Sequence, residues 1–402
     1  MTNFVDFLKS PELVIRVQEF FGIKYVHRKR KRATSETNEE NSETESVSLS
    51  PSPNGNLKKY EDEISEQKKI IIQNKFWYYI FLLGTELGDE AFYATFIPFW
   101  FWNIDGAVGR RVVLLWSSIM YVGQSLKDII RWERPGFPVI RLQKKWSIEY
   151  GMPSTHAMVG FSIPFSVLIF THQRYQYNFV FGIVIAVLWC TVVCLSRIYL
   201  GMHSVCDVVV GLLLTMVLMT VFVPLIDYAD FFIISWKYSP LFLLFISIMI
   251  IVYYPISDKW TPTRGDTTTV VSVTIGILIG AWINYQLGNM IPLKSSPPYK
   301  IIWPTYTMLG LLLLRTILGM CCIVATIAIG KSISYAIVCA ILGKDKNKLL
   351  NSENHLNNKD KIFVELCYKY LTYGLVGLST QYLLPSAFKL LGIERPNFYT
   401  EI

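Results

Sequence analysis

The sequence predicts an all-α fold: a polytopic membrane helix bundle of about nine transmembrane helices. Of the 402 residues, 52% are hydrophobic and only 17% are charged, whereas soluble domains carry about 25% charged residues. The apolar residues also gather into blocks near the length of about 20 residues that crosses the hydrocarbon core of a bilayer. These two observations exclude a single soluble domain, a disulfide-rich secreted module and a disordered chain.

The apolar blocks follow one another through most of the chain. We expect membrane helices near 77–102, 111–130, 155–171, 178–195, 204–226, 238–254, 268–288, 304–328 and 362–385. A further apolar stretch, 332–343, either extends the eighth helix or forms a short helix of its own. The polar block 344–361 is rich in Asn and Lys and is expected to be a solvated loop.

The blocks divide the chain into four parts. These are an amphipathic and basic N-terminal segment (1–32), a disordered polar linker (33–75), a catalytic membrane core (76–226) and additional C-terminal membrane helices (227–402). In the first part, residues 11–26 have helical periodicity but are too few and too charged to span, which favours an interfacial helix. The basic residues 27–32 are suited to anionic lipid headgroups.

The formal net charge of +8 could in principle indicate nucleic acid or an anionic membrane surface as partner. Residues 1–75 hold 13 basic against 12 acidic side chains, so the excess lies in residues 76–402. Charge is costly inside a membrane and usually has a function there. We therefore expect membrane lipids and no nucleic acid among the partners.

The first of three polar segments ends the second predicted helix. Lys127, Arg131 and Arg134 recur at spacings of four and three, on or near one helical face. One interpretation is the positive flank that is common at helix ends. The other is a phosphate clamp, because Arg offers a planar fork and Lys a point charge to an oxyanion.

The second polar segment precedes the third predicted helix. Pro153, Ser154 and Thr155 form a good helix start, since Ser or Thr caps free N–H groups and Pro is tolerated in the first turn. The same N–H groups also form an anion site. His156 follows one residue into the turn, where it could deliver a proton to a bound anion.

The third polar segment lies between the fourth and fifth predicted helices. His203 and Asp207 are four residues apart, so a helix that begins near them places both on one face. The carboxylate can then orient the imidazole and leave its other nitrogen free to attack. Arg197 offers another anion contact, and Gly201 allows close backbone approach.

Helix counting places all three segments on one side of the membrane, and together they suit cleavage of a phosphate monoester. His203, oriented by Asp207, would attack phosphorus and form a phosphohistidine, while His156 would protonate the leaving oxygen and then activate water. The phosphate would be held by Lys127, Arg134, Ser154, Arg197 and the backbone near Gly201. The chain shows no cluster with metal-ligand spacing, so we expect neither a metal nor a cofactor.

These segments resemble the motifs of the phosphatidic acid phosphatase type 2 superfamily. Lys127 with Arg134 is similar to its first motif, K-x6-R-P, residues 153–156 to its second, PSTH, and residues 196–207 to its third, SR-x3-G-x-H-x3-D. The resemblance implies a phosphatidic acid phosphatase type 2 catalytic core, with a histidine nucleophile and no metal.

Within that superfamily the chain resembles the sphingosine-1-phosphate phosphatases, mainly over residues 77–225. One departure is Glu133, where the family typically has proline, which places a carboxylate beside Arg134. The resemblance implies sphingosine-1-phosphate and dihydrosphingosine-1-phosphate as substrates and a multi-pass protein of the endoplasmic reticulum membrane. A homodimer is possible, but the sequence does not decide the oligomeric state.

Several alternatives stay open. The enzyme could act on another phosphate ester, such as lysophosphatidate, phosphatidate or a sugar phosphate, and a transporter also suits about nine helices with internal charges. The carboxylates of Glu86, Asp89 and Glu90 in the first helix either meet a substrate ammonium or pair with a nearby Arg. Glu149, like Trp132 and Tyr199, could contact the headgroup amine. The membrane face of the site is unresolved.

Overall fold

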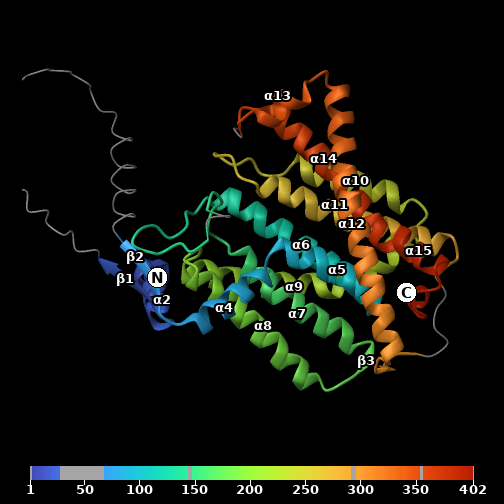
Figure 1. Cartoon of the computed structure of the whole chain (residues 1–402), viewed down its shortest axis with the longest axis horizontal. Helices are drawn as coiled ribbons and strands as arrows, with labels where there is room; N and C mark the ends of the chain where they lie inside the picture. The colour runs from blue at the N-terminus through green and yellow to red at the C-terminus, as the bar shows by residue number, and fades with distance from the viewer. Residues whose placement is uncertain (1, 28–67, 144–146, 291–295, 354–355, 402) are drawn as a thin grey trace, which may run out of the picture.

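The computed structural model describes residues 2–27, 68–143, 147–290, 296–353 and 356–401, which form a mainly helical bundle (Figure 1). The helices are α1 (Thr2–Lys9), α2 (Pro11–Phe20), α4 (Lys75–Glu86), α5 (Glu90–Asn103), α6 (Gly106–Ile130), α7 (Thr155–His172), α8 (Phe179–Tyr199), α9 (Val205–Ser235), α10 (Ser239–Val252), α11 (Thr263–Gln286), α12 (Tyr306–Ile341), α13 (Lys346–Asn351), α14 (Lys359–Leu378), the π-helical turn η1 (Ser379–Leu383), α15 (Leu384–Leu390) and the 3-10 turn η2 (Phe398–Thr400). Strands β1 (Ile23–His27) and β2 (Lys68–Ile72) pair antiparallel, and β3 (Tyr175–Gln176) and β4 (Tyr299–Lys300) pair in parallel.

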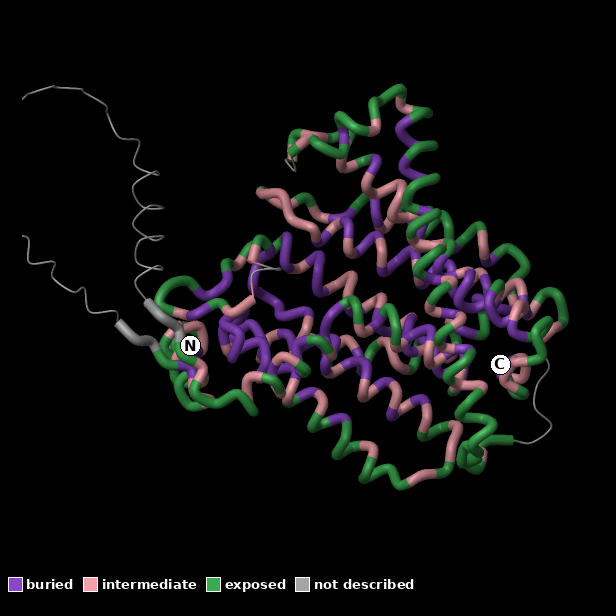
Figure 2. Tube along the Cα trace, viewed as in Figure 1, coloured by how far each residue is buried: buried purple, intermediate pink, exposed green. Residues whose placement is uncertain are grey.

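Several helices present apolar side chains outward, as a membrane protein requires. Five helices in the described ranges, α7, α8, α9, α11 and α12, are long and apolar enough to cross a membrane. Only 17% of the most apolar window of α12 is buried, and 28% of that of α8. Figure 2 shows these exposed faces around a buried centre. The multi-pass architecture is therefore confirmed, while the count of nine spans stays a prediction.

The first predicted helix, 77–102, is wrong as a single element. It is divided into α4 and α5 by three residues, 87–89. Asp89 begins α5 as its N-cap, with its carboxylate accepting the Ala91 N–H at 3.3 Å. A cap residue needs non-helical backbone angles, so the polar side chain that looked misplaced inside a membrane helix marks a break.

The fifth predicted helix extends past its predicted end at 226 to Ser235, through two acidic residues. Asp230 receives two hydrogen bonds from Arg110, at 2.8 and 3.1 Å, and Asp227 receives one from Arg111 at 2.6 Å. The arginines lie at the start of α6. Because each charge is paired across the α6–α9 contact, α9 continues where the sequence indicated a polar end.

The C-terminal half keeps the predicted order of helices, but α10 and α14, which correspond to the predicted spans 238–254 and 362–385, are not among the five candidate membrane-crossing helices of the described residues. The stretch 332–343 extends the eighth predicted helix, since α12 is continuous from Tyr306 to Ile341. The predicted helix 362–385 is α14 followed by η1 and α15, and the predicted loop 344–361 contains the short helix α13.

The N-terminal segment packs on the bundle at the end where α8 finishes. The expected helix 11–26 ends at Phe20 and is followed by β1, because Gly22 has a φ of +91°. The linker predicted over 33–75 contributes β2, and its residues up to 67 lie outside the described ranges, as do residues 28–32. The buried Gln18 amide donates to the carbonyls of Ile140 and Tyr199, at 2.8 and 2.9 Å.

The buried Arg110–Asp230 pair predicts a stability difference between two neighbouring carboxylates. Asp230→Ala leaves a fully buried guanidinium unpaired, so we expect it to cost roughly 3–5 kcal/mol of unfolding free energy. Asp227→Ala, whose carboxylate is 40% exposed, is the matched control and is expected to cost less than about 1 kcal/mol. Denaturant unfolding in detergent measures both, and equal losses would contradict this account.

Candidate active site

The three polar segments predicted from the sequence meet at one end of the bundle. They occupy the C-terminal end of α6 with the segment that follows it, the N-terminus of α7, and the turn from α8 into α9. In Figure 1 these termini lie toward the side of the N-terminal helices. The prediction that they share one side is confirmed, and contacts between their side chains define the site.

The prediction that Lys127, Arg131 and Arg134 share one helical face is wrong at Arg131. It ends α6 in the left-handed conformation, with a φ of +56°, so the helical face expected to run through Arg134 stops there. The Arg131 side chain is exposed and donates to the Ile256 carbonyl at 3.1 Å. Arg131 therefore lies outside the phosphate clamp, and Arg134 reaches the site from a non-helical segment.

Arg134 connects all three segments through its guanidinium. Its Nε donates to the Glu149 carbonyl at 3.0 Å, and its Nη1 donates to the Met202 carbonyl at 2.8 Å. The same Nη1 lies 3.0 Å from Nε2 of His203. Arg134 is 6% exposed, so these bonds form away from solvent, where they are strongest.

Lys127 joins the cluster from the last turn of α6. Its Nζ donates to the Glu149 carboxylate at 2.7 Å, and the same oxygen lies 3.6 Å from Nη2 of Arg134. All three side chains are buried. Glu149 therefore neutralises two of the predicted phosphate ligands here, rather than Glu133, which is exposed.

His203 is fully buried and lies between Arg134 and Asp207. Its Nδ1 is 3.8 Å from the nearer Asp207 oxygen, too long for a hydrogen bond but within ion-pair range. Because a guanidinium only donates, Nε2 must be the unprotonated nitrogen, and Nδ1 then carries the proton toward the carboxylate. The structure thus leaves the Nε2 lone pair directed at the cation cluster.

The N-terminus of α9 fixes the position of Asp207. Ser204 and Asp207 form a capping box, in which the Asp207 carboxylate accepts the Ser204 N–H at 2.8 Å and the Ser204 hydroxyl accepts the Asp207 N–H at 3.2 Å. The local helix start thereby holds the carboxylate beside the ring of His203.

Arg197, in the last turn of α8, is the third buried cation of the site. Its Nη1 donates to the Thr85 hydroxyl and, at 3.2 Å, to the Gln143 side chain. Its Nε and Nη2 have no hydrogen-bond partner in the described parts of the chain. Buried donors of this kind are normally satisfied, so they are available to an anion. Sequence reasoning missed Thr85 and Gln143, which belong to none of the polar motifs.

The N-terminus of α7 brings Ser154 and His156 to the same place. Ser154 is the N-cap residue, and its backbone N–H donates to the Asp207 carbonyl at 3.1 Å. The expected side-chain cap is absent, and the buried hydroxyl has no partner among the described residues. His156 lies against Gly88, where an added Cβ would come within 3.0 Å of its ring.

Gly201 allows the α8–α9 turn to approach the first segment. Its φ is +67°, and a Cβ there would lie 2.1 Å from the Ile140 carbonyl oxygen. The close backbone approach at this position is made to Ile140, and the expected contact of this turn with phosphate stays a prediction.

Three other residues that the sequence suggested for the substrate headgroup, Asp89, Tyr199 and Trp132, contact parts of the protein. Asp89 caps α5 and acts electrostatically on Arg197, which favours the arginine alternative for this carboxylate. Tyr199 is fully buried, with its ring centroid 4.7 Å from that of Phe81, and its contact with a headgroup stays a prediction. Trp132 stacks with Lys9, whose Nζ is 3.1 Å from the ring centroid.

A neutral imidazole among buried cations combines a nucleophile with ligands for an oxyanion, which cleavage of a phosphate ester requires. Residues 109–231 match the model of the PAP2 superfamily. Sphingosine-1-phosphate phosphatase 1 of Rattus norvegicus is 39% identical over 85% of this chain and 78% of its own length. Sphingosine-1-phosphate phosphatase 2 of Mus musculus is 40% identical over 80% of this chain and 90% of its own length. No solved structure matches.

A more distant relative is a dihydrosphingosine 1-phosphate phosphatase of Schizosaccharomyces pombe, 27% identical over 50% of this chain and 51% of its own length. The chain belongs to the PAP2 superfamily and, within it, to the sphingosine-1-phosphate phosphatase family. The resemblance seen in the three motifs is thereby confirmed.

Substitution of Gly201 is expected to reduce activity or folding by more than its positive φ alone would cause. Gly201→Ala is expected to abolish activity or folding, because the methyl group would collide with the Ile140 carbonyl. Gly288→Ala is the matched control, since Gly288 has a φ of +71° and no atom of the described residues lies within 4 Å of an added Cβ. It should cost only about 1–2 kcal/mol of stability. Thermal unfolding and phosphatase assays distinguish the two, and equally mild effects would contradict the collision.

The charges around His203 determine the pH at which kcat/KM should fall on the acid side of the pH profile. Burial lowers the pKa of His203 well below its ordinary value, and the nearby positive charges, Arg134 foremost, lower it further. The neutral, nucleophilic form therefore persists as pH falls through 6.5, and kcat/KM should lose activity from this group only at lower pH. Arg134→Gln removes a positive neighbour, so its acid limb should move to higher pH. Profiles measured with one substrate test this, and coincident limbs would contradict it.

Proposed function

We propose that the chain hydrolyses sphingosine-1-phosphate and dihydrosphingosine-1-phosphate to the free long-chain base and inorganic phosphate. One observation carries the proposal: Nε2 of the buried His203 lies 3.0 Å from the guanidinium of Arg134. That arrangement presents a nucleophile at the point where a bound phosphate would meet the cations. The named activity of the relatives supplies the substrate class.

The proposed reaction has two steps. The Nε2 lone pair of His203 attacks phosphorus, the bond to the ester oxygen breaks, and His156 gives its proton to the departing alkoxide. His156 then takes a proton from water, which attacks the phosphohistidine, breaks the P–N bond and releases phosphate. Asp207 stabilises the positive charge that develops on the ring of His203 in the first step.

The positive groups of the site stabilise the negative charge of the transition state. Lys127, Arg134 and Arg197 are buried, so their interaction with a phosphoryl group is strengthened by the low dielectric. Further donors are the Ser154 hydroxyl and the two N–H groups of Arg197 that have no partner among the described residues. We propose that this charge replaces a metal ion and that no cofactor takes part.

The location of the site suits a membrane-borne substrate. A phosphate at the end of the bundle leaves the long chain of the substrate among apolar helices. We further propose about nine spans and residence in the endoplasmic reticulum membrane, as the resemblance implies. Oligomeric state, including a homodimer, stays open.

Replacement of the nucleophile tests the chemistry. His203→Ala is expected to lower sphingosine-1-phosphate hydrolysis by at least about 10³-fold, while wild type stays active with a metal chelator present. His172→Ala, in the last turn of α7 at the other end of the bundle, is the control and should hydrolyse normally. Phosphate release by purified protein measures both. Residual activity above a tenth in His203→Ala would refute the role, and normal lipid movement by that variant would favour a transporter.

Substrate choice is tested by comparing phosphate esters. We expect sphingosine-1-phosphate and its dihydro form to have the highest kcat/KM, and lysophosphatidate, phosphatidate and a sugar phosphate to be at least about tenfold lower. Mixed micelles of one composition keep lipid presentation equal. A clear preference for phosphatidate would contradict the sphingoid assignment but leave the His203 chemistry intact.

A further inference from the structure

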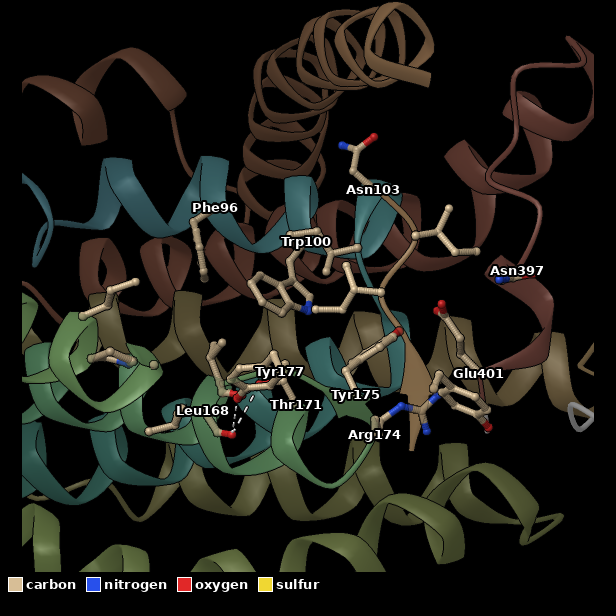
Figure 3. Close-up of a pocket in the computed structure, with 18 of the residues that line it drawn as sticks. Phe96, Trp100, Asn103, Leu168, Thr171, Arg174, Tyr175, Tyr177, Asn397 and Glu401 are labelled. Carbon is tan, nitrogen blue, oxygen red and sulfur yellow. Dashed lines mark hydrogen bonds between the residues drawn. The ribbon is translucent and has the colours of Figure 1, made fainter. Parts of the chain in front are cut away.

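A cavity lies at the opposite end of the bundle from the catalytic cluster. It has a volume of about 850 Å³ and is lined by α5, α7, α8, the segment that leads into α12 and residues near the C-terminal end, among them Arg395 and Glu401. Figure 3 shows Phe96 and Trp100 of α5 beside the cavity, with Arg174, Tyr175 and Glu401 gathered at one end. This volume is within the roughly 300–1,000 Å³ range of small-molecule pockets. None of the site residues described above lines it.

Close packing separates this cavity from the catalytic histidines. A Cβ added to Gly160 would lie 2.7 Å from a methyl group of Val193, so α7 and α8 touch there. Val193 also lies against Gly88, next to His156. The cavity begins beyond this contact, at Ile163 on α7 and Trp189 on α8. It is therefore a site distinct from the one that would bind the substrate phosphate.

The depth of the cavity matches one leaflet of a bilayer. Along α7 its lining extends over the nine residues from Ile163 to Thr171, and the eight rises between them correspond to about 12 Å of helix. A leaflet contributes about 15 Å of hydrocarbon. The walls are mostly aliphatic and aromatic, with Phe96, Val167 and Ile185 as examples. An acyl chain that entered the cavity from the membrane surface opposite the catalytic end would therefore contact apolar walls through most of the thickness of that leaflet.

The mouth of the cavity carries an excess of positive charge. Arg174 pairs with Asp105 at 3.0 Å, and Arg395 makes two hydrogen bonds to Glu401. Lys300 also lines the cavity, is exposed, and adds a third cation against these two carboxylates. The balance at the mouth favours an anionic headgroup.

Three N–H groups of the lining residues have no partner in the part of the chain that the structure describes. They are Nε of Arg395, whose side chain is 12% exposed, Nε1 of Trp100, one turn before the end of α5, and Nε1 of Trp189, at the deep end of the cavity. The first two can only donate, so a matching ligand must bring acceptor oxygens to the mouth and just below it. Phosphate and ester carbonyl oxygens occupy these depths in a glycerophospholipid, whereas a sterol has one hydroxyl and a long-chain base is cationic.

We propose that this cavity binds an anionic glycerophospholipid from the leaflet opposite the catalytic end. Its phosphate lies near Lys300 and Arg395, an ester carbonyl accepts from Trp100, and one acyl chain lies between α7 and α8. The site is independent of the proposed hydrolysis and holds a lipid that is not turned over.

Two neighbouring residues of α8 provide a matched test. Ala186 lines the cavity, whereas Val187 is 47% exposed on the outer surface of the helix and does not line it. Delipidated protein is mixed with dioleoylphosphatidylglycerol, and bound lipid is counted by native mass spectrometry. We expect one retained lipid for wild type and Val187→Trp, and at least tenfold less retention for Ala186→Trp. Equal retention by the two variants would overturn the proposal.

A second variant keeps the test decisive if Ala186→Trp fails to fold. Lys300→Glu reverses an exposed charge at the mouth and should remove the preference for phosphatidylglycerol over phosphatidylcholine. An unchanged preference would count against the site. Sphingosine that displaced the phospholipid at equal concentration would also overturn the proposal, since the cavity would then be a site for the long-chain base.

Discussion

The site depends on the contacts that the guanidinium of Arg134 makes. It bonds the backbone of Glu149 and of Met202 and lies against His203, so one side chain joins three segments far apart in the sequence. The donors of a buried guanidinium are normally satisfied, and those of Arg134 bond to the backbone of two other segments. These bonds hold the loop after α6, the approach to α7 and the α8–α9 turn in fixed relative positions.

The same contact has an electrostatic consequence. Lys127, Arg134 and Arg197 are all buried, and only Lys127 and Arg134 share a carboxylate, that of Glu149. Burying uncompensated charge is costly. Two N–H groups of Arg197 have no partner among the described residues, and we propose that an anion completes the site. On this proposal, stability given up at the end of the bundle serves to bind the substrate phosphate.

Much of the site was predictable because its chemistry is encoded locally. Ser204 with Asp207 is a capping box readable from the sequence, and the i, i+4 spacing placed His203 beside Asp207 as expected. Arg131 was misplaced because its left-handed backbone cannot be read from a helical pattern. Thr85 and Gln143 could not be found either, since their contacts with Arg197 arise from tertiary packing alone.

In the fold, too, locally encoded features were predictable and features that depend on tertiary contacts were not. Hydropathy located the long helices, but it gave no means to see that Asp230 continues α9, because Arg110, its partner, is 120 residues away in sequence. The break between α4 and α5 had a visible signal in Asp89, a good N-cap residue. Acidic residues inside apolar blocks are thus informative in two ways, as caps and as halves of buried pairs.

We propose that Nε2 of His203 becomes covalently phosphorylated during turnover. Acid-free rapid quenching of the purified protein with ³²P-labelled sphingosine-1-phosphate, followed by peptide mapping, detects this intermediate. We expect an acid-labile, base-stable label on His203 that is lost in His203→Ala. Steady hydrolysis without any such label, or a label on another residue, would contradict it.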